Sequence, residues 1–209
     1  ENPDAPALTF LPSGALDADS VRLKRGELLG NIRQAANMFH DLGIESGDVV
    51  SFLLPNLLET HYTLWGAQAA GIANPINFLL GTDQIVEICN AAHTKILVAL
   101  GPHPTLDIWQ KVEALKDQVK TLEKVLIVGG IPKTADKVLS FQKTVDSYPK
   151  NKLIFDREIN ENDIASLFHT GGTTGTPKLA PHTHGNEVAA AKSTAQMYDM
   201  NEQDVLVNG

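Results

Sequence analysis

Short apolar runs alternate with longer helical segments through most of this sequence, and this alternation constrains the fold more than any other feature. Strands that alternate with helices of ten or more residues indicate right-handed βαβ crossovers. The sequence therefore predicts an α/β fold with a mainly parallel sheet flanked by helices. The strands are expected at 49–54, 72–76, 95–100, 124–128 and 164–169, and the helices at 23–42, 57–70, 83–92, 105–119, 138–148 and 184–200.

The clearest of these elements is the helix at 23–42. Apolar residues recur there at steps of three or four, as at Leu28 and Ile32, and Gly43 follows. This spacing gives a helix one apolar face, and glycine is a common helix stop. The next apolar run, at 49–54, is short and bounded by turn residues. It is therefore predicted to be a strand buried on both faces.

The alternation weakens in two places. Between residues 129 and 163 the sequence favours an excursion over the surface with one helix at 138–148. The apolar strand expected at 164–169 resumes directly afterwards, so this stretch is not a domain linker. Residues 204–209 look like the beginning of a further apolar strand.

Composition and charge exclude several functional classes. The chain of 209 residues has a net charge of −8 and a pI of about 5.3, which argues against nucleic-acid binding through phosphate contacts. Its apolar runs are strand-sized, so no transmembrane segment is expected. The single cysteine, Cys89, excludes an internal disulfide and a cysteine metal site. With no signal-like segment after Glu1, these features predict a cytoplasmic protein.

The segment whose residues most suggest ligand binding reads TGGTTGTPK, from Thr170 to Lys178. It directly follows a predicted strand. Glycines let backbone N–H groups converge on an anion, and threonine hydroxyls add further donors. Lys178 adds a mobile cation of the kind that binds phosphate. Since open α/β sheets bind ligands at the carboxyl ends of their strands, the segment predicts polyphosphate binding. The candidate residues are Thr170, Gly171, Gly172, Thr173, Thr174, Gly175 and Lys178.

Two other interpretations of this segment are less favoured. A surface turn without a ligand would not explain why a strand, a glycine-rich loop, a lysine and a helix occur together. A Walker A loop opens its helix with Gly-Lys-Ser/Thr, whereas Lys178 follows Pro177 and precedes Leu179. Because Pro177 favours an extended Thr176, a P-loop kinase or GTPase is disfavoured.

The same residues resemble the adenylate-forming superfamily, which includes acyl-CoA synthetases, luciferases and peptide-synthetase adenylation domains. TGGTTGTPK followed by THGN at 183–186 is similar to the family's signature, roughly (T/S)SGTTGxPKG with a later THxN. The stretches LGIESGDVVSFLLPN and WGAQAAGIANPIN resemble its earlier conserved blocks in the same order. Gly171 stands where serine is commonest, and Leu179 where glycine is usual. The resemblance extends from about Leu23 to Val207.

The resemblance implies a two-step reaction. A carboxylic acid would attack the α-phosphate of ATP to give an acyl-adenylate and pyrophosphate, and the thiol of coenzyme A would then displace AMP. In this scheme Lys178 acts catalytically through its charge on the departing pyrophosphate. ATP, Mg²⁺ and coenzyme A are the implied cofactors, and no residue of the chain is assigned as a metal ligand. The other candidate residues would hold the β- and γ-phosphates: Thr170, Gly171, Gly172, Thr173, Thr174 and Gly175.

The resemblance also implies that the family's adenine pocket, ribose-binding aspartate and small C-terminal domain come later in the chain. Residues 1–209 are therefore expected to be an incomplete N-terminal domain of an acyl-CoA synthetase, inactive alone. Such a piece would expose apolar surface or a strand edge, so self-association is expected. The acid that is activated stays unidentified.

Alternatives to an active ligase remain open at this point. One is a non-catalytic nucleotide-binding module or degenerate homologue, marked by Gly171 and Leu179. Another is a structural or interaction protein that does not respond to ATP.

The remaining polar and aromatic residues favour structural roles. His182 and His184 lack a third ligand at a metal-site spacing, and His184 is expected at a helix entrance. His169 is expected to make ordinary hydrogen bonds at a strand end. Cys89 is predicted to be a buried hydrophobe. Helix packing against the sheet is expected to explain His61, Tyr62 and Trp65, and a solvated face to explain Asp156, Glu158, Glu161 and Asp163.

Overall fold

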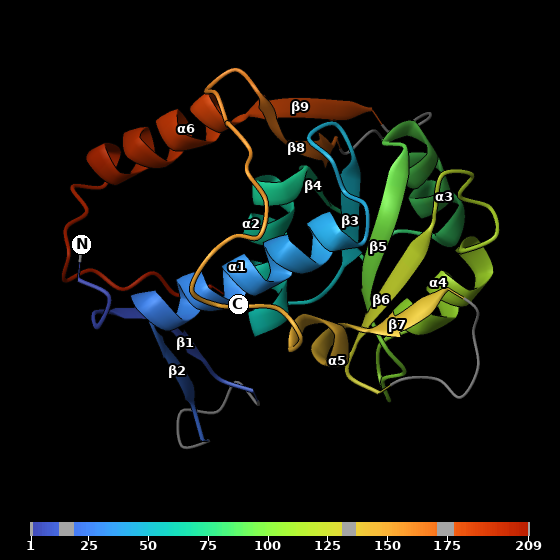
Figure 1. Ribbon diagram of the computed structural model, residues 1–209, viewed down its shortest axis with the longest axis horizontal. Coiled ribbons are helices and arrows are strands. Elements are labelled where there is room, and N and C mark those ends of the chain that lie inside the picture. Colours follow the sequence, from blue (N-terminus) through green and yellow to red (C-terminus); the bar gives the residue numbers. More distant parts are fainter. Residues whose placement is uncertain (1, 13–18, 131–136, 171–177, 209) are drawn as a thin grey trace.

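The computed structural model describes residues 2–12, 19–130, 137–170 and 178–208. Its strands are β1 (Pro6–Phe10), β2 (Val21–Lys24), β3 (Val49–Leu53), β4 (Ile72–Pro75), β5 (Thr94–Leu100), β6 (Lys124–Val128), β7 (Val138–Ser140), β8 (Ile164–His169) and β9 (Leu179–Thr183). Its helices are α1 (Arg25–Asp41), α2 (Leu58–Ala70), α3 (Thr82–Ala91), α4 (Ile108–Leu115), α5 (Phe141–Val145) and α6 (His184–Met197). Figure 1 shows their arrangement.

The main sheet confirms the predicted α/β class. Its strand order over the described residues is β7-β6-β5-β3-β4-β8-β9. Neighbouring strands run parallel except β8 and β9, which are antiparallel. A separate antiparallel pair, β1 and β2, precedes α1. Parallel strands need covering layers on both faces, and the helices provide them.

Two apolar clusters fill the two sides of the sheet. Along β5, Ile96 and Val98 belong to the cluster that includes α1, α2 and α5, whereas Leu97 and Ala99 belong to the cluster that includes α3 and α4. Successive residues of a strand point to opposite faces, so this division follows from the strand geometry. Figure 1 shows the two groups of helices on opposite sides of the sheet.

The contact between α1 and α2 is unusually close at one glycine. A Cβ atom placed on Gly66 would lie 2.7 Å from the Cβ of Ala35 and 3.0 Å from the backbone nitrogen of Ala36. Real Cβ atoms do not approach other carbon atoms this closely, so only glycine fits here without a shift of the helices.

A small polar network lies inside the sheet. The hydroxyls of Ser51 and Thr94 are 2.6 Å apart, and the Asn74 side-chain amide donates to Ser51 over 2.8 Å. Cys89 lies beside Thr94 and Ser51 and is fully buried, as predicted. Its burial raises the pKa of the thiol to about 11.

Several predicted boundaries need correction. Residues 23 and 24 belong to β2, so the first helix begins at Arg25. The helix expected at 138–148 is the short strand β7 followed by the single-turn helix α5, because residues 138–140 pair with β6. The helix expected at 105–119 covers Ile108–Leu115, and α6 ends at Met197 rather than residue 200. Residues 204–208 form no strand.

Aromatic residues of α2 follow the expectation only in part. Tyr62 packs against the core on the α1–α2 side. Trp65, however, is 40% exposed and stacks on the ring of His61, with centroids 5.6 Å apart. The packing prediction was therefore wrong for Trp65, because its position on α2 faces solvent rather than the sheet.

Candidate functional site

A β-hairpin brings the two ends of the candidate segment together. The backbone N–H of Thr170 donates to the carbonyl oxygen of Lys178 over 2.9 Å, and His169 pairs with Leu179 at the adjoining end of the β8–β9 ladder. Both Thr170 and Lys178 are exposed. Five predicted binding residues lie outside the described part of the chain: Gly171, Gly172, Thr173, Thr174 and Gly175.

The end of the hairpin that contains Thr170 and Lys178 lies at the carboxyl edge of the sheet. β8 runs parallel to β4, and β4 runs parallel to β3, so these strands share one carboxyl edge. Thr170 follows directly on the last residue of β8. The end of β4 and the residue Asn77 lie at the same edge. Thr170 and Lys178 therefore lie at this edge, outside which the ligands of open α/β sheets bind.

His169 makes the ordinary strand-end hydrogen bond expected of it. The backbone N–H of Asn77 donates to Nε2 of His169 over 3.1 Å. Burial lowers the pKa of His169, which favours the neutral ring that can accept this hydrogen bond.

The THGN sequence builds the entrance of α6, as expected. The Thr183 hydroxyl accepts from the backbone N–H of Asn186 over 3.1 Å, and Oδ1 of Asn186 accepts from the backbone N–H of Thr183 over 3.2 Å. This reciprocal pair is a capping box. The backbone N–H of His184 donates to the carbonyl of Asp163. A Cβ on Gly185 would lie 2.9 Å from the carbonyl oxygen of Glu161, which explains the glycine.

The histidines here do not gather metal ligands. His182 is exposed and packs edge-on against Phe168, with ring centroids 4.8 Å apart. Burial lowers the pKa of His184, and the nearby positive charge of Arg157 lowers it further. Within the described ranges, no three His, Cys, Asp or Glu side chains are placed to hold an ion.

The sequence analysis did not identify Gln68, a residue of α2 whose side chain bonds to both β8 and α6. Its side-chain nitrogen Nε2 donates to the Ser166 hydroxyl of β8 over 3.0 Å and to Oε2 of Glu187 in α6 over 2.7 Å. Gln68 is only 8% exposed. The one available signal was a glutamine within the small, apolar sequence GAQAAG, where a polar side chain needs partners.

Leu179, where the resemblance implies a glycine, has a packing role. Its side chain lies partly buried against both the α3–α4 cluster and the small cluster of Val49, Ile72 and Ala92. An apolar residue at this position therefore attaches the start of β9 to the body of the domain.

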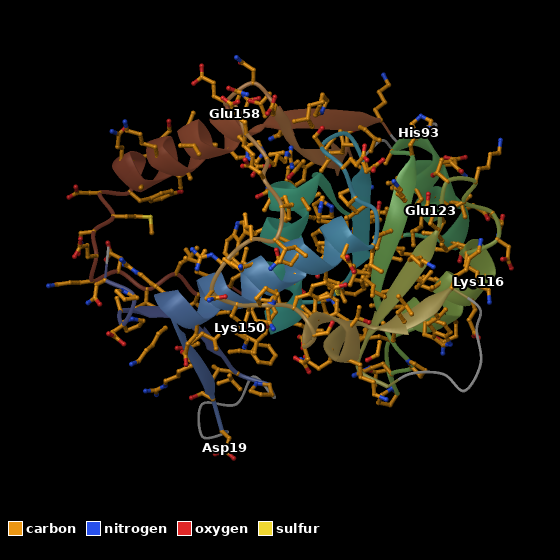
Figure 2. All side chains as sticks on the ribbon, in the orientation of Figure 1. Asp19, His93, Lys116, Glu123, Lys150 and Glu158 are labelled. Atoms are coloured by element: carbon orange, nitrogen blue, oxygen red, sulfur yellow. The ribbon has the colours of Figure 1, made fainter. Side chains whose placement is uncertain are left out.

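The acidic residues before β8 are mostly solvated, as predicted. Asp156, Glu158 and Glu161 are exposed, and Figure 2 shows Glu158 at the outer surface near the root of α6. Asp163 is partly buried, and its carboxylate accepts from the backbone N–H of Asn160 over 2.9 Å.

A surface depression of about 460 Å³ lies elsewhere, beside α1, where Arg33 and Lys150 contribute to its wall. Of the candidate phosphate-binding residues, the two that the structure describes, Thr170 and Lys178, do not line it. The segment's position at the carboxyl edge is the stronger guide to function, because it follows from the topology of the sheet.

The family model for AMP-binding enzymes matches residues 1–208. The chain belongs to this family. It is 39% identical over 180 residues to the marinolic acid–CoA ligase of Pseudoalteromonas sp. (strain SANK 73390), a match that covers 86% of this chain and 27% of that protein. It is 26% identical over 188 residues to the long-chain-fatty-acid–CoA ligase FadD13 of Mycobacterium tuberculosis, covering 90% of this chain and 35% of that protein.

Solved structures show the same fold. The Brucella canis acyl-CoA synthetase has a TM-score of 0.76 at 20% identity and covers 98% of this chain and 35% of its own. The anthranilate CoA ligase AuaEII, solved in complex with anthranoyl-AMP, has a TM-score of 0.72 at 24% identity and covers 87% of this chain and 33% of its own. The chain thus spans about a third or less of the relatives it matches here.

In the part of the chain that the structure describes, no helix is long and apolar enough to cross a membrane.

Proposed function

We propose that this chain supplies the ATP phosphate-binding segment of an acid–thiol ligase. The ligase activates a small-molecule carboxylic acid as its acyl-adenylate and transfers the acyl group to coenzyme A. The observation that carries this proposal is the family's phosphate-loop signature in a hairpin whose ends, Thr170 and Lys178, are joined at the carboxyl edge of a parallel sheet. Family membership and CoA ligases among the relatives support it.

In this proposal the chain's contribution is to bind, orient and stabilise charge. Residues 170–175 hold the β- and γ-phosphates of ATP, and Lys178 stabilises the charge that develops on pyrophosphate as it leaves. Such groups lower the barrier because they are already oriented when charge develops. Mg²⁺ accompanies ATP, and coenzyme A accepts the acyl group. The net charge of −8 disfavours a nucleic-acid partner, and the lone cysteine favours the cytoplasm.

The proposal also assigns residues 1–209 to an incomplete N-terminal domain. In this proposal the complete ligase also has the remainder of that domain and a small C-terminal domain, which the greater length of the relatives would accommodate. The chain alone is then inactive in adenylation, because one phosphate-binding segment does not hold the nucleotide and the acid in reacting geometry.

The proposal is tested by carboxylate-dependent pyrophosphate release in the complete protein. Lys178→Ala is expected to reduce kcat by about 100-fold, the usual effect of removing one group that stabilises transition-state charge. The control is Lys192→Ala, which removes an exposed lysine from α6. Equal activity of the two variants would contradict the catalytic role of Lys178. Pyrophosphate release by the 209-residue chain alone would contradict the assignment of domains.

A non-catalytic nucleotide-binding module is the second candidate, and the departures at Gly171 and Leu179 favour it. It predicts that the complete protein binds ATP without carboxylate-dependent pyrophosphate release. Calorimetric titration with ATP, run beside the release assay, separates the two candidates.

Self-association is part of the proposal for the chain alone. None of the described residues of α6 is buried, and Val188 and Met197 are 69% and 72% exposed. Residues 205–207 are also highly exposed, and β9 leaves one edge of the sheet unpaired. Exposed apolar surface and strand edges favour association. Light scattering that finds only monomers at high concentration would contradict this expectation.

A further inference from the structure

One side-chain hydrogen bond joins the carboxyl ends of β4 and β8. The backbone N–H of Asn77, two residues beyond β4, donates over 3.1 Å to Nε2 of His169, the last residue of β8. The two residues are 92 positions apart in sequence. This bond therefore joins two parts of the chain that only the fold brings together.

The backbone ladder between β4 and β8 is short. Among the described residues it consists of the pair Ala73 and Ser166, whereas β8 and β9 pair at five positions. The β8–β9 hairpin is thus internally well paired but joined to β4 over a short stretch. The bond from Asn77 therefore adds a polar contact at the carboxyl end of this junction, beyond the ladder pair.

The partner of His169 is itself firmly placed. Ile76, the residue before Asn77, donates its backbone N–H to the carbonyl of Phe52 in β3 over 3.0 Å. The side-chain oxygen of Asn77 accepts from the backbone N–H of Leu79 over 3.0 Å. Asn77 therefore lies in a turn that is bonded to the centre of the sheet. Its hydrogen bond to His169 in turn fixes the position of the imidazole ring.

The bond lies directly beside the proposed phosphate-binding residues. Thr170 follows His169, and its N–H closes the hairpin onto Lys178. We propose that His169 is a positioning residue that, through its hydrogen bond from Asn77, holds Thr170 and Lys178 at the carboxyl edge of the sheet for ATP. This inference rests on the proposed function, because it assigns a role within the same site.

The chemistry of the imidazole suits this role. Nε2 can accept the N–H of Asn77 only in the neutral tautomer that carries its proton on Nδ1. Burial lowers the pKa of His169, and no charged group of the described residues contributes to the shift. The ring is thus available as an acceptor at neutral pH.

Three variants of the complete ligase test the inference in the pyrophosphate-release assay. His169→Phe keeps a ring but removes the acceptor, and is expected to raise the KM for ATP about 5-fold, the factor that matches one hydrogen bond of about 1 kcal/mol. The kcat is expected to fall as well, but far less than in Lys178→Ala, because the lysine that stabilises pyrophosphate is kept and only held less firmly. His169→Gln places a carbonyl oxygen near the position of Nε2 and is expected to restore the KM.

The control is His182→Phe, in the same hairpin. His182 packs against Phe168 and forms no hydrogen bond to β4 among the described residues, so its KM for ATP is expected to match the wild type. Hydrogen–deuterium exchange of the peptide that contains Asn77 gives a readout that does not depend on ATP. This peptide is expected to exchange faster in His169→Phe than in His169→Gln.

The outcomes separate this inference from the proposed function. An unchanged KM in His169→Phe, with an active wild type, would overturn the inference alone. Failure of His169→Gln to restore the KM would also overturn it, since a loss of ring packing would then explain the effect. Absence of ATP-dependent activity in the wild type would overturn the proposed function and this inference with it.

Discussion

Gln68 offers a sensitive test of how α2, β8 and α6 are held together. The change Gln68→Met keeps an unbranched side chain of similar length and removes the donor that bonds Ser166 and Glu187. Because methionine fills the same space, the loss of hydrogen bonds should dominate over cavity formation. We expect the free energy of unfolding to fall.

The magnitude follows from the two bonds. Loss of the neutral bond to Ser166 costs about 1 kcal/mol, and loss of a bond to a charged group costs about 1.5–3 kcal/mol. Among the described residues Oε1 of Glu187 is buried without a hydrogen-bond partner, and the bond from Gln68 to Oε2 is the side-chain bond that this carboxylate would lose. Glu187 is only partly buried, so the lower end of that range applies. The expected loss is about 2.5 kcal/mol.

Urea denaturation of four proteins measures this loss and assigns it: the wild type, each single variant and the double variant with Glu187→Ala. Once the carboxylate is gone, Gln68→Met should cost only about 1 kcal/mol. The coupling energy between the two positions is then about 1.5 kcal/mol. Gln118→Met is the matched control, because Gln118 is exposed and, among the described residues, its side chain bonds to the carbonyl of Ala114, four residues before it.

Two results would refute the reasoning about Gln68. The first is a loss in Gln68→Met no greater than that in Gln118→Met. The second is a coupling energy near zero, which would mean that the bond between Gln68 and Glu187 adds no stability to the junction.

Three further predictions concern packing and titration. Gly66→Ala should destabilise the chain by about 1–3 kcal/mol through overpacking although alanine favours helices, whereas Gly47→Ala, with no atom within 4 Å, should not; urea midpoints that rise for Gly66→Ala would contradict this. Cys89 should resist a thiol reagent in the folded chain and react on unfolding, and rapid labelling of folded protein would disprove its burial. The free energy of unfolding should fall as the pH drops below 6.5. In that range the histidines of the unfolded chain bind protons, whereas the partly buried histidines of the folded chain, with their lowered pKa, stay neutral. The histidines with a lowered pKa are His61, His169 and His184. Urea denaturation over a pH series measures the change, and a free energy of unfolding that stays constant or rises below pH 6.5 would contradict the prediction.

The parallel sheet was predictable because its central strands are buried on both faces. Such strands must be almost continuously apolar, as β3 and β5 are, and the helices between them carry the one-sided apolar spacing that a covering layer needs. Burial therefore marks these elements in the sequence itself. The same pattern predicted that β8 ends directly before Thr170, the first residue of the candidate segment.

The strands at the edges of the sheet, β7 and β9, lack this continuous apolar run. β7 has three residues, too few to show a period of two, and the helical pattern that follows concealed it. β9 contains Pro181, which argues against a central strand but is tolerated at an edge. Its pairing with β8 depends on a tertiary contact that local periodicity cannot show.

The register of β9 connects these edge effects to the proposed chemistry. Because side chains alternate along a strand, a shift of one residue would exchange the surroundings of Lys178 and Leu179. Leu179 is held by its apolar contacts, and the bond between Thr170 and Lys178 fixes the same register from the backbone. In place of the glycine that the resemblance implies, Leu179 therefore adds a constraint. Its apolar contacts leave the neighbouring Lys178 exposed at the carboxyl edge, where the proposed function requires an ATP phosphate.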